Sequence, residues 1–103
     1  MPRPIEACID RAALRHNYRR AKQCASREYP AAQTWAVVKA NGYGHGLQRV
    51  AAALVDLADG FALLDLDEAL CLREAGFRQP ILLLEGFFEA ADLPLCAQQR
   101  LTL

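Results

Sequence analysis

The sequence has no net charge, no cysteine-pair motif and no long apolar run. Its 12 Lys and Arg residues balance its 12 Asp and Glu residues, so no net field favours binding to nucleic acid or to an anionic membrane surface. Apolar runs are short, as in residues 81–84, and the first residues lack the apolar core of a leader. We therefore expect neither a signal peptide nor a membrane span, and a small or zwitterionic ligand is compatible with the balance of charge.

The four cysteines are spread widely along the chain, at Cys8, Cys24, Cys71 and Cys96. They form no C-x-x-C pair, and no histidine lies close enough to complete a zinc site, so we expect no metal. We interpret them as reduced thiols of a cytoplasmic protein, most of them small core residues.

The composition, 53% hydrophobic in 103 residues, is that of one globular domain. Predicted strands and helices alternate along it, and no linker or charge run divides it. In the first half we expect an extended segment at 5–9, a helix capped by Asp10 and ending before Pro30, a strand at 34–38 and a glycine-rich loop at 39–46. A helix from Leu47 and a strand at 61–64 follow, and then a helix at 67–75 that is capped by Asp67 and ended by Gly76. The last elements are a strand at 81–84 after Pro80, a helix at about 89–98 and a strand from 101.

Two of the predicted helices carry an apolar stripe, formed by Leu14, Tyr18, Ala21 and Ala25 in the first and by Leu47, Val50, Ala51, Leu54 and Ala58 in the second. The strands are continuously apolar, which is typical of a parallel sheet buried on both faces. An open doubly wound sheet and a (β/α)8 barrel both fit this α/β pattern. Four strands are half of a barrel, and such a half leaves two unpaired sheet edges.

Lys39 follows directly on the apolar strand at 34–38, at the strand end where barrel enzymes place their catalytic groups. An amine held against apolar neighbours loses its proton more easily, and it can then attack a carbonyl to form a Schiff base. The alternative is a lysine that reaches from the strand end into solvent.

The loop after Lys39 carries Gly42, Gly44 and Gly46, which permit backbone conformations and close approaches that other residues resist. It is neither a P-loop nor a dinucleotide fingerprint, because the lysine precedes the glycines and their spacing differs from G-x-G-x-x-G. The loop leads into a helix start that can attract an anion, but a purely structural turn explains the glycines equally well.

Two side chains of the loop have both a chemical and a structural interpretation. Tyr43 can donate a hydrogen bond to a phosphate or can simply pack its ring on the loop. His45 can act as an acid, a base or an orienting donor, or it can cap the following helix. His16 lies among arginines on a solvated helix face.

Several carboxylates lie at or just beyond strand ends, at Asp65, Asp67, Glu68 and Glu85. Acids in this place can form a catalytic pair or bind a divalent cation. A helix start explains Asp65 and Asp67 without either role. Glu85 ends the third strand, and we assign it no role.

Residues 36–46, with the sequence AVVKANGYGHG, resemble the pyridoxal 5'-phosphate attachment motif of bacterial alanine racemases. The resemblance continues in chain order through residues 7–18, 60–76 and 81–88 and covers essentially the whole chain. One departure is Gly42, where the family most often has alanine. We expect this change to loosen the loop without removing a functional group.

The resemblance implies that residues 1–103 are four βα units of a TIM-like barrel, the incomplete N-terminal part of the cofactor-binding domain. Lys39 would hold pyridoxal 5'-phosphate covalently and serve as the base on the D-alanine side, Tyr43 would lie near the cofactor phosphate, and His45 would shape the loop. A second base, a tyrosine from the partner subunit of a homodimer, and an arginine at the pyridine nitrogen would come from residues outside this chain.

Two hypotheses of different classes follow. The first is an alanine racemase, an isomerase that interconverts L- and D-alanine for peptidoglycan supply and to which this chain contributes the lysine without being active alone. The alternative is a non-catalytic remnant, or a small pyridoxal-phosphate-binding module of the same barrel superfamily. The Y-G-H-G string argues against such a module, and equally against related enzymes that act on ornithine, arginine or diaminopimelate.

Overall fold

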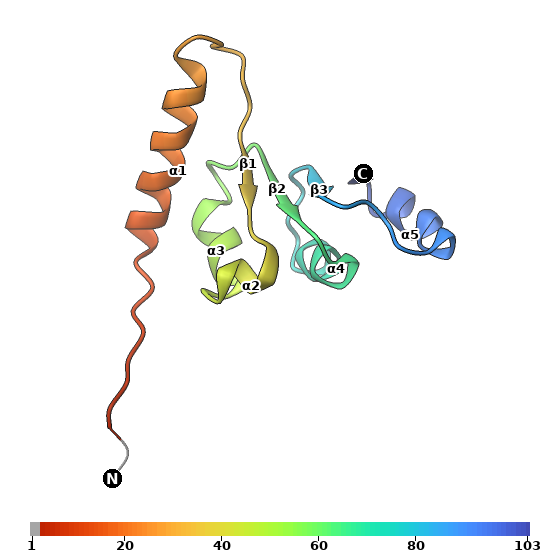
Figure 1. The fold of residues 1–103 in the computed structure, drawn as a ribbon, viewed down its shortest axis with the longest axis horizontal. Coiled ribbons are helices and arrows are strands. Elements are labelled where there is room, and N and C mark those ends of the chain that lie inside the picture. The colour runs from red at the N-terminus through yellow and green to blue at the C-terminus, as the bar shows by residue number, and fades with distance from the viewer. Residues whose placement is uncertain (1–2) are drawn as a thin grey trace.

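The computed structural model describes residues 3–103, in which helices alternate with four parallel strands (Figure 1). The elements are α1 (Arg11–Ser26), β1 (Trp35–Val37), α2 (Lys39–Tyr43), α3 (Leu47–Leu54), β2 (Gly60–Leu63), α4 (Leu66–Glu74), β3 (Ile81–Leu83), the 3-10 turn η1 (Ala90–Asp92), α5 (Leu93–Gln98) and β4 (Leu101–Thr102). The strands lie in the order β1-β2-β3-β4, and each pair is parallel. None of the helices in residues 3–103 is long and apolar enough to cross a membrane.

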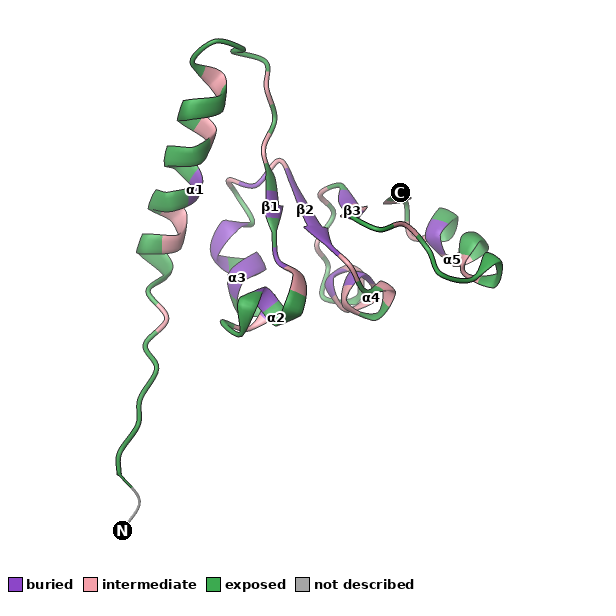
Figure 2. Cartoon of the chain, in the orientation of Figure 1, coloured by how far each residue is buried: buried purple, intermediate pink, exposed green. Residues whose placement is uncertain are grey.

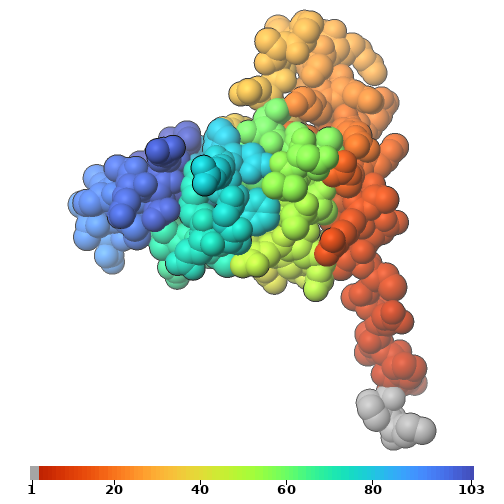
Figure 3. Space-filling model, turned by 180° about the vertical axis from the view of Figure 1, so that it is seen from behind, coloured from red at the N-terminus to blue at the C-terminus, as the bar shows by residue number. Residues whose placement is uncertain are grey.

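The strand order distinguishes between the two architectures that the sequence allowed. Right-handed crossovers between strands that follow one another in both sequence and space bring every connecting helix to the same face of the sheet. A doubly wound sheet needs a reversal in strand order, and these four strands have none. The fold is therefore the α/β fold of successive βα units expected for part of a barrel, and its colours follow one another across the molecule in chain order (Figure 3).

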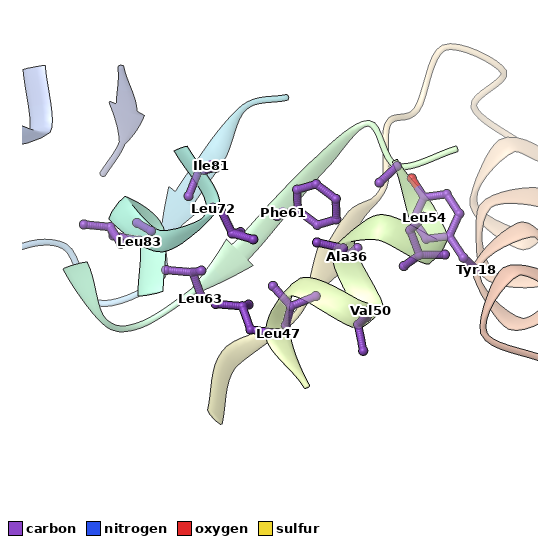
Figure 4. Packing of buried hydrophobic residues seen from close by; sticks show 14 of the residues in the cluster. Tyr18, Ala36, Leu47, Val50, Leu54, Phe61, Leu63, Leu72, Ile81 and Leu83 are labelled. Carbon is purple, nitrogen blue, oxygen red and sulfur yellow. The ribbon is translucent and has the colours of Figure 1, made fainter. Parts of the chain in front are cut away.

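The core lies between the helices and one face of the sheet (Figure 4). Ala36, Phe61 and Ile81 form one row across paired strands, and Leu63 and Leu83 lie in a second row toward the carboxyl ends. The predicted apolar stripe is buried in this core, with its last member, Ala58, beyond the end of α3, and Ala69 and Leu72 of α4 and Cys96 of α5 join it. The period of about four residues in α3 thus predicted its buried face correctly.

The opposite face of the sheet is only partly covered within the described residues: Ala62 of β2 is fully buried there, but its neighbours are not. Trp35 and Val37 of β1 are each 41% exposed, and Leu84 after β3 is 43% exposed. The prediction of burial on both faces is confirmed for β2, whose four residues are all buried, and is wrong for β1, because α3, α4 and α5 all pack on the other side. The apolar character of the strands shows that they are suited to burial, but it does not specify what covers them.

Helix α1 packs against α3 at the edge of the sheet and extends beyond it (Figure 1). The expected N-cap is confirmed, since the Asp10 side chain accepts a hydrogen bond from the Ala13 N–H at 3.1 Å. Only Tyr18 of this helix is buried, however, and the expected stripe residues Ala21 and Ala25 are exposed (Figure 2). A single neighbouring helix buries a narrower stripe of α1 than a sheet would.

A polar cluster ties α1 to the sheet in place of a wide apolar contact. Lys22 lies 2.7 Å from Asp59, the Thr34 N–H donates to the same carboxylate at 2.8 Å, and the Tyr18 hydroxyl donates to Thr34 O at 2.8 Å. The Lys22 ammonium holds the pKa of the Asp59 carboxyl below its usual value, and burial raises the pKa of the Tyr18 phenol. The residue before β2 is therefore bonded both to α1 and to the residue before β1.

The start of α4 corrects one prediction. Asp65 has the extended backbone of an N-cap, and Asp67, expected as the cap, lies inside the first turn. Both positions favour an acid because of the exposed N–H groups and the helix dipole, so the pattern alone does not distinguish between two starts that lie two residues apart. The end of α4 agrees with the prediction, since Gly76 takes the left-handed conformation at φ +94°.

Candidate functional site

Lys39 lies at the carboxyl end of β1, as its position in the sequence predicts. The preceding Val38 continues the pairing of β1 with β2, because its N–H donates to Ala62 O at 2.8 Å. The Lys39 side chain is half-buried, and it takes part in neither of the two ion pairs of residues 3–103, Arg15–Asp56 and Lys22–Asp59. The structure therefore places a primary amine at the carboxyl end of a strand, where barrel enzymes have their active sites.

The backbone after Lys39 is a left-handed turn rather than an open loop. Ala40, Asn41, Gly42 and Tyr43 have φ of +53°, +55°, +63° and +55°. This conformation costs a residue with a Cβ about 1–2 kcal/mol, less for asparagine. The prediction that the glycines permit unusual backbone conformations is confirmed, because Gly44 and Gly46 also have positive φ. The positive φ of their non-glycine neighbours was not predicted.

Asn41 is the centre of the bonds that hold the turn. Its side-chain Oδ1 accepts from the Leu47 N–H at 2.8 Å and so caps α3, and its carbonyl accepts from the Gly46 N–H at 2.9 Å. Its own N–H donates to Glu68 Oε2 at 2.9 Å. Three different groups of this asparagine are therefore fixed, and one of them is bonded to a residue from the next βα unit.

Glu68 is the residue of the site that the sequence did not identify. The sequence places it among the acids near strand ends that can form a catalytic pair or bind a cation, and it predicts no contact with the glycine-rich loop. The available signal was its place beyond β2, since the carboxyl ends of neighbouring parallel strands share one edge of the sheet. The hydrophobic periodicity of the helix and the spacing of its acids did not show which acid of α4 would reach the neighbouring turn.

The two predicted side chains of the loop lie differently. Tyr43 is 59% exposed, so its phenol is available to solvent or to a ligand, and its phosphate contact stays a prediction. His45 is exposed and its Nδ1 lies 3.1 Å from Gly42 O, which agrees with a role in shaping the loop.

Gly42 is buried inside the turn. A Cβ at this position would lie 3.0 Å from Val50 Cγ2, closer than most carbon contacts in proteins. Its N–H also donates to Val38 O at 2.9 Å. The turn is therefore closely packed on α3 at this residue, and any added methyl group must displace Val50 slightly.

The remaining carboxylates are not brought together into a site. Asp65 and Asp67 flank the start of α4, as expected, and both are exposed, as is Glu85 after β3. Among residues 3–103 there is no group of three or more His, Cys, Asp or Glu side chains placed to hold a metal ion.

Comparisons with known proteins agree with this arrangement. A family model described as alanine racemase, N-terminal domain, matches residues 9–103. The chain is 60% identical over 98 residues to an alanine racemase of Albidiferax ferrireducens, covering 95% of this chain and 25% of that protein. It is 56% identical over 102 residues to an alanine racemase of Cupriavidus metallidurans, covering 99% of this chain and 26% of that protein.

Solved structures show the same likeness. The biosynthetic alanine racemase from Pseudomonas aeruginosa superimposes with a TM-score of 0.79 and 49% identity over 90% of this chain and 25% of that one. A histidine racemase from Leuconostoc mesenteroides superimposes with a TM-score of 0.75 and 34% identity over 90% of this chain and 24% of that one. The chain spans about a quarter of the length of these relatives, and it belongs to the alanine racemase N-terminal domain family.

Proposed function

We propose that this chain supplies the N-terminal part of an alanine racemase and that Lys39 holds pyridoxal 5'-phosphate covalently. The observation that carries the proposal is a half-buried amine at the carboxyl end of β1, followed at once by a hydrogen-bonded left-handed turn in a chain of this family. The residues present fit the group, since a primary amine can bond to its aldehyde and the exposed Tyr43 phenol can donate to its phosphate.

The chemistry divides between the cofactor and the protein. When bound, the cofactor accepts the electrons of the Cα–H bond, which makes that proton removable. The Lys39 amine takes and returns a proton at the substrate Cα on one face, which we assign to D-alanine. The base on the other face is expected from a partner subunit of a homodimer, so we expect residues 1–103 alone to be inactive.

The test uses this chain followed by the part of the A. ferrireducens alanine racemase that lies beyond the matched segment, called here the joined protein. We expect it to racemise alanine and Lys39→Ala to lose at least about a thousandfold in kcat, because a covalent and a proton-transfer role are removed together. The chain has only two lysines, and Lys22→Ala is the matched control. Activity that survives Lys39→Ala would overturn the assignment.

A labelling experiment locates the cofactor independently of activity. Reduction of the joined protein with borohydride fixes pyridoxal 5'-phosphate to the amine that holds it, and peptide mass spectrometry then identifies that residue. We expect the label on Lys39, in the peptide that contains residues 39–46. A label on Lys22 alone would contradict the proposal.

A racemase for another amino acid is the second candidate, favoured by the likeness to the histidine racemase. The joined protein is assayed with alanine and histidine side by side. A kcat/KM for alanine within tenfold of that of the parent enzyme supports the first proposal, and a preference for histidine supports the second. Cofactor binding without racemisation of either would favour a non-catalytic binding module.

A further inference from the structure

We propose that Glu68 is a positioning residue for Lys39, because its carboxylate fixes the left-handed turn that begins at the lysine. This inference rests on the proposed role of Lys39. It concerns how the amine is held in place, and it adds a residue from α4 to a site otherwise built from residues 39–46.

The turn needs support from outside itself. Ala40, Asn41 and Tyr43 have φ of +53° to +55°, a region that residues with a Cβ leave unless their surroundings hold them there. Relaxation of Ala40 or Asn41 would rotate the backbone next to Lys39. The direction of the amine therefore depends on the bonds that keep this segment left-handed.

Most of those bonds are local. The Gly42 N–H donates to Val38 O at 2.9 Å, the Gly44 N–H to Ala40 O at 3.1 Å, and Asn41 Oδ1 accepts from Leu47 at 2.8 Å. These bonds connect the turn to the end of β1, where Val38 is itself paired with Ala62 of β2, and to the start of α3. None of these bonds connects the turn to α4.

Glu68 supplies a connection to α4. Its Oε2 lies 2.9 Å from the Asn41 N, and its neighbours on α4, Ala69 and Leu72, are fully buried in the core. The carboxylate therefore extends from a fixed part of the helix to the second residue after Lys39. Hydrogen bonds from a backbone N–H to a charged carboxylate are stronger than those to a neutral acceptor.

The helix dipole does not account for this contact. Asp67 lies in the same first turn of α4, carries the same charge and is exposed. Both acids are favoured by the helix start, yet only Glu68 accepts the Asn41 N–H. Substitution of Asp67 therefore serves as a control that distinguishes a positioning role of Glu68 from a contribution to the helix start.

The test compares Glu68→Ala, Glu68→Gln and Asp67→Ala in the joined protein. Without the carboxylate we expect kcat to fall about tenfold to a hundredfold, because a displacement of about 1 Å at a reacting group has an effect of this size, while KM for alanine changes less. Glu68→Gln retains a neutral acceptor and should recover part of the loss. Asp67→Ala should leave kcat within about twofold.

A second readout is independent of catalysis. Hydrogen–deuterium exchange of the Asn41 amide, measured without pyridoxal 5'-phosphate, should speed up at least about tenfold in Glu68→Ala and less in Glu68→Gln, since the loss of a charge-assisted bond exposes this N–H. Exchange across β2 should stay unchanged, and faster exchange there in every Glu68 variant would show general unfolding and count against positioning.

The outcomes separate this inference from the proposed function. If Lys39→Ala abolishes racemisation while both Glu68 variants keep normal kcat and normal Asn41 exchange, Glu68 has no positioning role and the proposed function stands. If Glu68→Ala frees the Asn41 amide but Lys39→Ala remains active, the bond is real and the assigned role of Lys39 is wrong.

Discussion

The two ends of β1 are held by the same kind of bond but differ in what surrounds it. Just before the strand, the Thr34 N–H donates to Asp59 at 2.8 Å, and just after it the Asn41 N–H donates to Glu68 at 2.9 Å. Asp59 directly precedes β2, and Glu68 follows it. The residues flanking β2 thus fix both ends of its neighbour.

The difference lies in the backbone and in the other partners. At the amino end, Asp59 is paired with Lys22, and its carboxylate joins α1 to the sheet. At the carboxyl end, Glu68 holds a strained left-handed turn next to Lys39. The comparison teaches that one carboxylate stabilises the packing of elements, whereas the other bonds to a backbone conformation that is costly for residues with a Cβ. This agrees with the division in barrels between a stabilising amino-terminal face and a functional carboxyl-terminal face.

The largest effect on stability is expected at the amino end. Asp59→Ala should destabilise the chain by about 2–3 kcal/mol, because the Thr34 N–H and the Lys22 ammonium both lose their acceptor. Urea unfolding of the full chain measures the change, with the exposed Asp56→Ala as a milder control. In the joined protein below its unfolding temperature, Asp59→Ala should leave kcat for alanine unchanged. A kcat lowered as far as in Glu68→Ala would end the distinction between the two ends.

The pH dependence of stability should also come from the amino end. The Lys22 ammonium, helped by the Thr34 N–H, holds the pKa of Asp59 below its ordinary 3.8, and hydrogen bonding to Asp59 raises the pKa of Lys22 above 10.5. The stabilisation from a lowered carboxyl pKa is present above pH 3.8 and is lost as pH falls toward the folded value. That from a raised lysine pKa is present below pH 10.5 and is lost above it.

Urea unfolding between pH 2.5 and 7 measures the acid side of this window. The Asp59→Asn variant should lose less stability on acidification than the natural chain does, because its amide does not titrate. Equal acid sensitivity of the two proteins would show that other carboxyls, such as Asp56 beside Arg15, control the acid limb.

The smallest effect is expected inside the turn. Gly42→Ala should destabilise the chain by about 1 kcal/mol, because the new Cβ takes a φ of +63° and meets Val50 at 3.0 Å. Gly44→Ala is the matched control, with φ +86° and no heavy atom within 4 Å of the added Cβ. The difference between the two variants in urea unfolding isolates the Val50 contact. Stabilisation by Gly42→Ala would show that the turn accepts a methyl group without strain.

Much of the fold could be predicted because local patterns suffice for it. The buried face of α3, the Asp10 cap, Gly76 after α4 and the strand after Pro80 each follow from a few adjacent residues. The errors occurred where a neighbour decides the outcome. Ala21 and Ala25 are exposed because α1 contacts one helix, and Trp35 and Val37 on the second face of the sheet are exposed because every connecting helix packs on the first face.

The sequence alone determined the alternation of strand and helix, the place of Lys39 at a strand end and the family resemblance, because all three are properties of consecutive residues. Only the tertiary structure decided that the residues after Lys39 turn left-handed and that Glu68, 27 positions beyond Asn41, holds them there. The physical reason is that a strained backbone and a bond between units depend on what parallel pairing brings to one edge of the sheet. Local residue propensities do not predict that the turn after Lys39 and Glu68 lie side by side.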